Sequence, residues 1–125
     1  MDATLRAIRL NVNKYAECLE FYRDVLGFKL HWGDDSTLIA DFMLGSTMLA
    51  ICRVAPSESG ARRGSDDRVT IVLRVDDLDE EYARLKQRGV EFVTEPEDMP
   101  ALHVRGARFR DPEGNLLEIN VRLSG

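Results

Sequence analysis

The stretches "RAIRLNVNKYAECLEFYRDVLGFKL" (residues 6–30) and "RVTIVLRVDDLDEEYARLKQRGVEFV" (residues 68–93) decide the fold, because the second repeats the pattern of the first. Aligning Val12 with Val75 brings Gly27 over Gly89 after a one-residue gap. Further along, "GSTMLAI" (45–51) aligns with "GNLLEI" (114–119) and sets Ala50 against Glu118. A repeat on this scale predicts two copies of one structural unit.

Each copy begins with a strand and continues with a helix. Apolar residues alternate with other residues at the start of both copies, which is the period of a half-buried strand. The helix that follows in the first copy has Asn13 as its predicted cap. Its predicted apolar side consists of Tyr15, Cys18, Leu19, Tyr22, Val25 and Leu26. In the second copy, Asp77 with Glu80 three residues later is an Asp variant of the capping box.

Three strand-like runs separated by turn residues follow each helix. They cover residues 28–32, 37–43 and 47–54 in the first copy, and 90–94, 102–110 and 115–123 in the second. In the "RDPEGN" turn, Asp111 is assigned to turn formation and Gly114 to a positive φ. The prediction is an α+β domain over residues 1–125, with βαβββ modules at 5–54 and 68–124 and a flexible linker at 55–67. Two curved mixed sheets would enclose a cleft suited to a ligand.

Composition narrows the class of function. A chain of 125 residues with 44% hydrophobic and 31% charged residues is typical of one globular domain. A net charge of -5 argues against a nucleic-acid partner, which clustered lysine and arginine would attract. No apolar run is long enough to span a membrane, and the N-terminus does not resemble a signal peptide, so we expect a cytoplasmic location.

Two motifs resemble those of a known family. "NVNKYAECLEFYRDVLGF" (11–28) and "FRDPEGNLLEI" (109–119) look like the vicinal-oxygen-chelate superfamily, which includes glyoxalase I, extradiol dioxygenases, fosfomycin-resistance enzymes and bleomycin-binding resistance proteins. The resemblance implies a cleft between βαβββ modules and a homodimer. In metal-using members, it further implies metal ligands from the first and last strand of each module.

Carried over residue by residue, the implied metal-ligand positions are Ala7, Ala50, Thr70 and Glu118. A catalytic metal normally takes three or more nitrogen, oxygen or sulfur donors from the protein. Alanine provides none, and a threonine hydroxyl replaces imidazole or carboxylate poorly. We therefore predict no metal and no other cofactor.

Glu118 has two interpretations. By alternation it shares a face with Leu116 and Asn120, while Leu117, Ile119 and Val121 point to the helix side. As a structural residue, it would be hydrogen-bonded or paired with an arginine across the sheet, with Arg9 and Arg74 as candidates. As a functional residue, it would orient a bound molecule or act as a general base.

Further candidate residues also carry a structural alternative. His103 could bond a ligand or act in acid/base chemistry, or have no chemical role. Arg9, Asn11 and Arg74 would suit an anionic or polyhydroxylated ligand, although Arg74 could instead pair with Glu118. Trp32 and Phe42 could stack on a planar ligand, or serve in core or dimer packing.

These observations favour a metal-free protein that binds a small organic ligand, either to sequester it or to sense it. The alternative is an enzyme: a glyoxalase- or dioxygenase-like metalloenzyme, or a metal-independent isomerase with Glu118 as its base. Loss of turnover on Glu118→Gln would favour the enzyme.

Overall fold

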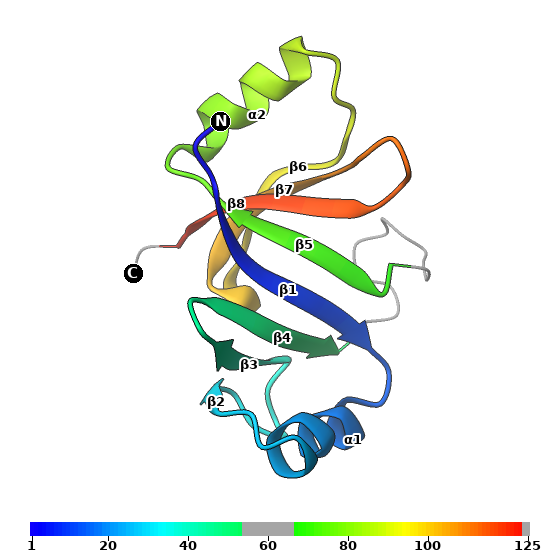
Figure 1. Cartoon of the computed structure of the whole chain (residues 1–125). Helices are drawn as coiled ribbons and strands as arrows, with labels where there is room; N and C mark the ends of the chain where they lie inside the picture. The colour runs from blue at the N-terminus through cyan, green and yellow to red at the C-terminus, as the bar shows by residue number, and fades with distance from the viewer. Residues whose placement is uncertain (54–66, 124–125) are drawn as a thin grey trace. The chain divides into compact units, whose positions relative to one another are not determined.

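The computed structural model describes residues 1–53 and 67–123 (Figure 1). The predicted linker at 55–67 lies outside the described residues except for Asp67. Two compact units make up the chain: an N-terminal unit, Ala7–Val69, and a C-terminal unit that joins Met1–Arg6 to Thr70–Gly125. The first strand therefore starts in one unit and ends in the other.

The N-terminal unit follows the predicted order of elements. Its elements are β1 (Thr4–Val12), α1 (Tyr15–Glu20), the helical turn η1 (Phe21–Val25), β2 (Leu30–Trp32), β3 (Ile39–Leu44) and β4 (Thr47–Arg53). The strands lie in the order β2-β3-β4-β1. β1 and β4 are parallel, while the β3–β4 and β2–β3 pairs are antiparallel.

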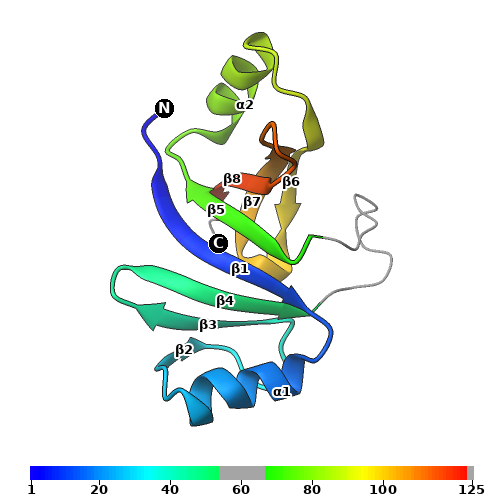
Figure 2. The ribbon, with the colours of Figure 1, turned by 45° about the vertical axis from the view of Figure 1, so that its right-hand side comes forward.

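The C-terminal unit repeats this arrangement (Figure 2). Its elements are β5 (Val69–Arg74), α2 (Leu78–Gln87), β6 (Phe92–Met99), the turn η2 (Pro100–Leu102), β7 (Val104–Arg110) and β8 (Leu116–Arg122). The strand order is β5-β8-β7-β6, again with one parallel pair, β5–β8, and two antiparallel pairs. The predicted α+β class and the duplicated βαβββ pattern are confirmed. None of the helices within 1–53 and 67–123 is long and apolar enough to cross a membrane.

Each unit has its own apolar cluster. In the N-terminal unit, Tyr15 and Leu19 of α1 pack with Ala40, Phe42 and Ile51 of the sheet. In the C-terminal unit, Leu78 of α2 packs with Val75, Ala107 and Ile119. Each helix thus covers one face of its own sheet, and the polar residues of the opposite face are left for other roles.

The first helix differs from its prediction at both ends. Its N-cap is Lys14 with no side-chain hydrogen bond, so the prediction of Asn13 as the cap is wrong. After Glu20 the chain widens into a π-helical turn, in which the Leu26 N–H donates to Phe21 O. The wider turn takes the residues in it and after it out of register with the buried face of α1. Val25 and Leu26 are consequently 68% and 46% exposed, not on the buried side as predicted.

The second helix and the last turn form as predicted. The Asp77 side chain accepts a hydrogen bond from the Glu80 N–H at 3.0 Å, which confirms it as the cap of α2. Asp111 accepts hydrogen bonds from the N–H groups of Glu113 and Asn115, both at 2.9 Å. Gly114 has φ 94°, a conformation that favours glycine. This turn delivers the chain into β8, which carries Glu118.

Candidate functional site

Glu118 lies on the face of β8 that points away from α2. Ile119 and Val121 pack into the helix-side cluster, as the alternation predicted. Glu118 is 0% exposed and Asn120 is 1% exposed. A carboxylate buried this deeply requires partners, because water cannot stabilise its charge.

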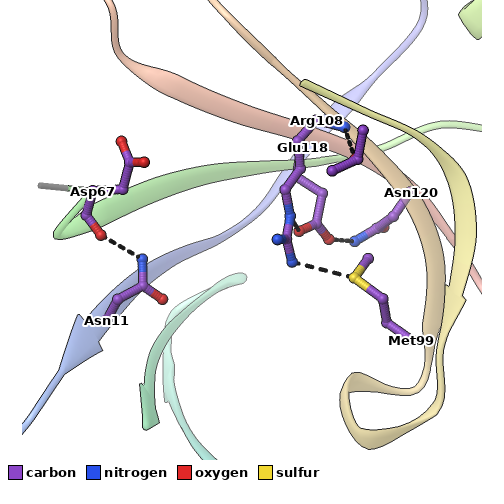
Figure 3. Close-up of polar contacts among 7 residues, drawn as sticks. Asn11, Asp67, Met99, Arg108, Glu118 and Asn120 are labelled. Atoms are coloured by element: carbon purple, nitrogen blue, oxygen red, sulfur yellow. Dashed lines mark hydrogen bonds and ion pairs between the residues drawn. The ribbon is translucent and has the colours of Figure 1, made fainter. Parts of the chain in front are cut away.

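One partner of Glu118 lies on β7 and the other on β8 itself (Figure 3). Nε of Arg108 on β7 donates to Glu118 Oε1 at 3.2 Å, and Nδ2 of Asn120 donates to Glu118 Oε2 at 2.7 Å. Nε of Arg74 on β5 donates to Asn120 Oδ1 at 2.8 Å. Arg108 Nη2 also donates to the Met99 sulfur at 3.2 Å. We call these five residues, Arg74, Met99, Arg108, Glu118 and Asn120, the Glu118 network.

The expected arginine partner exists, but it is a different arginine. Arg108 forms the ion pair with Glu118, while Arg74, a predicted partner, reaches the network through Asn120. The signal for Arg108 was present in the sequence: antiparallel strands joined by the 111–115 turn place Arg110 opposite Leu116 and Arg108 opposite Glu118. Pairing the residues of the two strands outward from this turn would have identified Arg108 as the cross-strand neighbour of Glu118.

Burial and neighbouring charges both act on Arg74. Desolvation lowers the pKa of its guanidinium, and the positive charges of Arg6 and Arg122 lower it further. The negative charge of Glu118 acts in the opposite direction. Positive charge is therefore concentrated at this end of the network.

Gly106 permits the close packing beneath the network. It lies opposite Asn120 in the β7–β8 register. A Cβ there would lie 3.0 Å from the Met99 methyl carbon and 3.0 Å from Ile119 O. The missing side chain therefore leaves room for Met99 beside Arg108.

The predicted polar residues of the N-terminal unit lie on β1. Arg9 is 6% exposed and stands opposite Ala50 of β4, which in turn stands opposite Asp41 of β3. The Asn11 side-chain amide donates to Asp67 O at 2.9 Å (Figure 3). Its backbone N–H donates to Arg68 O at 2.8 Å. Asn11 thus links the end of β1 by hydrogen bonds to the residues that precede β5.

The remaining predicted residues have different surroundings. Phe42 is 0% exposed and belongs to the helix-side cluster with Tyr15 and Leu19, so it has the core-packing role of its two alternatives. Trp32 on β2 is 42% exposed. His103 is exposed, follows η2 and has φ 64°. Its carbonyl accepts a hydrogen bond from the Leu123 N–H.

The four positions that the family resemblance assigns to metal ligands are all buried. Ala7 and Ala50, in the N-terminal unit, are 8% and 2% exposed. Thr70 and Glu118, in the C-terminal unit, are 2% and 0% exposed. Within residues 1–53 and 67–123, no three or more His, Cys, Asp and Glu side chains gather in an arrangement that could hold a metal ion.

The repeated βαβββ units define the class of protein, an α+β fold of the glyoxalase type. The family model "Glyoxalase/Bleomycin resistance protein/Dioxygenase superfamily" matches residues 4–119, so the chain belongs to this superfamily. YraH, an uncharacterized protein of Bacillus subtilis, is 31% identical over 126 residues that cover 95% of this chain and 98% of YraH.

Solved structures show the same fold. A hypothetical protein from Bacillus halodurans has a TM-score of 0.78 at 18% identity, over 100% of this chain and 98% of its own. Methylmalonyl-CoA epimerase from Mycobacterium tuberculosis has a TM-score of 0.70 at 22% identity, over 96% of this chain and 88% of its own. At these identities the likeness concerns the fold and leaves the chemistry to the residues of this chain.

Proposed function

We propose that the protein binds a small organic molecule without a metal, and that it sequesters or senses this ligand. One observation carries the proposal: both carboxylate oxygens of Glu118 already have partners, at 3.2 Å to Arg108 and at 2.7 Å to Asn120. The guanidinium of Arg108 occupies the carboxylate oxygen that a metal ion would otherwise contact. A divalent cation beside it would be repelled.

The other three family positions support the same conclusion. The methyl groups of Ala7 and Ala50 have no donor atoms, and the Thr70 hydroxyl is a weak metal ligand. The donors at these four positions therefore do not fit a catalytic metal, which normally takes at least three protein ligands. A polar, partly buried face without metal donors suits recognition of an organic molecule by fixed hydrogen bonds.

Metal content and melting temperature test the metal-free state. The protein is purified without chelators or a metal-affinity tag, analysed for metals and then melted with zinc, nickel, iron(II) or manganese. A cation that binds only the folded state must raise the melting temperature. We expect no stoichiometric metal and no shift. Stoichiometric metal with a shift that Glu118→Gln removes would overturn the proposal.

An enzyme that uses Glu118 as its base is the alternative function. A general base must come within hydrogen-bonding reach of the proton that it removes. Glu118 is 0% exposed and lies beneath Arg108, whose side chain is 19% exposed, which favours a structural carboxylate. Turnover of a glyoxalase or epimerase substrate that Glu118→Gln abolishes would decide for the enzyme.

We further propose a cytoplasmic homodimer with neither nucleic acid nor membrane as a partner. The dimer is supported by the family resemblance alone, and the choice of partner is supported by the net charge of -5. Light scattering after size-exclusion chromatography should give twice the mass of 14.2 kDa. A monomer across the accessible concentration range would contradict the dimer.

A further inference from the structure

Two arginines flank β8 in equivalent ways. Arg74 on β5 stands opposite Asn120, and Arg108 on β7 stands opposite Glu118. Each arginine uses its Nε to donate to its partner on β8, at 2.8 Å and 3.2 Å respectively. Asn120 and Glu118 are themselves joined at 2.7 Å. The two guanidinium groups are therefore positioned by one hydrogen-bonded pair between them.

Anchoring through Nε leaves outer nitrogens of both guanidinium groups for another partner, although Nη2 of Arg108 also contacts the Met99 sulfur. A guanidinium has five N–H donors. In the described part of the chain, the guanidinium of Arg108 donates from Nε to Glu118 and from Nη2 to the Met99 sulfur, a weak acceptor. That of Arg74 donates from Nε to Asn120. The Arg108 side chain is 19% exposed and Arg74 is half-buried, so a small molecule could reach both.

The local charge is positive although the chain is acidic overall. The network contains two guanidinium groups and one carboxylate. The positive charges of Arg6 and Arg122 also act on Arg74 and lower its pKa. Arg6 and Arg122 repel the partly buried guanidinium of Arg74, and an anion bound beside Arg74 would offset this repulsion. A chain with a net charge of -5 thus places two further positive charges near Arg74.

We propose that Arg74 and Arg108 bind the oxyanion group of the ligand, a carboxylate or a phosphate, through their Nη atoms. This inference rests on the proposed function and names the ligand class for it. Planar N–H pairs of arginine match the two oxygens of such groups in a bidentate manner. Glu118 and Asn120 are positioning residues that set the directions of the two guanidinium groups.

Nitrogen–proton NMR of the arginine side chains tests the proposal directly. The probes are benzoate, its neutral analogue benzamide and inorganic phosphate, each titrated at constant ionic strength. We expect benzoate or phosphate to shift the Nε signals of Arg74 and Arg108 in a saturable way, and benzamide to leave them in place. A response to benzoate alone would assign a carboxylate, and a response to phosphate alone would assign a phosphate.

Three lysine substitutions separate recognition from stability. Arg108→Lys and Arg74→Lys keep the positive charge but remove the planar donor pair. Each should lower the affinity for the anion that binds at least tenfold. Arg105→Lys is the matched control, because Arg105 lies on the same strand and pairs with Asp98 at 3.1 Å. It should change the affinity less than twofold. Thermal melting without ligand checks that each variant folds. If Arg108→Lys does not fold, Arg74→Lys alone provides the test.

Contrary results would separate this inference from the function on which it rests. Equal shifts with benzamide and benzoate, no saturable response to either anion, or equal weakening by Arg105→Lys would overturn the oxyanion site. Binding of a neutral compound with the Nε signals unmoved would also overturn it, but would leave metal-free ligand binding intact. The proposed function itself would be overturned by stoichiometric metal whose stabilisation depends on Glu118, or by turnover that Glu118→Gln abolishes.

Discussion

At the scale of single residues, Glu118 carries a charge that its burial would otherwise make costly. Removing a carboxylate from water costs several kcal/mol, which is recovered only when its geometry and remaining hydrogen bonds are good. Arg108 supplies the opposite charge and Asn120 supplies a second donor. Each oxygen of the carboxylate thus has a donor, so this side chain cannot change without disturbing its neighbours.

Substituting Glu118→Gln should destabilise the fold by about 3 kcal/mol, the range for breaking a buried charge pair. The glutamine oxygen could still accept from Arg108, but its NH2 group would face the donor NH2 of Asn120. Turning the Asn120 amide would in turn cost the hydrogen bond from Arg74. Urea unfolding measures the difference. Glu97→Gln is the control at an exposed position of β6 and should stay within about 0.5 kcal/mol. Equal effects of the two substitutions would contradict the network.

The acid response of the last turn follows from Asp111. The pKa of this carboxyl lies below its ordinary value of 3.8, chiefly because the side chain of Asn115 donates to it, and also because backbone N–H groups of Asn115 and Glu113 do. Since the folded-state pKa is lowered, its stabilising effect is present above the unfolded pKa and is lost as pH falls through the folded pKa.

A carboxyl-detected NMR titration should therefore place the Asp111 midpoint below 3.8. Asn115→Ala removes the largest cause and should move the midpoint back toward that value. Asp111→Asn should abolish this part of the acid-dependent destabilisation. An Asp111 midpoint at or above the ordinary value would mean that the turn does not hold the ionised carboxylate.

At the scale of elements, the sequence pattern predicted the strands but only part of the first helix. Alternation identified which residues of β8 face α2, because a strand has only two faces. The π-helical turn escaped prediction since a 3.6-residue period cannot reveal a wider turn, and this turn exposes Val25 and Leu26. Tyr22 still packs near Phe28 and Phe42.

The candidate site was predicted to a similar extent. The sequence singled out Glu118 on the face of its strand away from the helix, and an arginine partner was one of its two interpretations. Arg108 was missed because identifying it required the register of the β7–β8 hairpin, not the pattern of one strand. Phe42 was ambiguous for the same reason: an aromatic side chain on a strand suits either face until the register is known.

The two helix starts offer a matched test of capping. Asp77→Ala removes the acceptor of the Glu80 N–H and should cost about 1 kcal/mol of unfolding free energy. Asn13→Ala alters a residue that lies before the actual N-cap, Lys14, and should cost less than about 0.5 kcal/mol. Chemical denaturation of both variants measures the contrast. A larger cost for Asn13→Ala would restore Asn13 as the cap.

At the scale of the whole molecule, the two units share one continuous strand. β1 runs without a break from Thr4 to Val12, yet its first residues belong to the C-terminal unit and those from Ala7 onward to the N-terminal unit. Unfolding either unit would therefore release part of a strand on which the other depends. This continuity predicts one cooperative transition, although the apolar clusters of the two units share no residue.

The single tryptophan makes this cooperativity measurable. Trp32 lies in the N-terminal unit, whereas Ile119 is 0% exposed in the cluster of the C-terminal unit. Ile119→Ala should cost about 2–5 kcal/mol, the range for truncating a buried isoleucine. If the chain unfolds as one, the urea midpoint reported by Trp32 fluorescence must fall together with that from circular dichroism. An unchanged Trp32 midpoint, with a second transition by circular dichroism, would mean that β1 does not couple the two units.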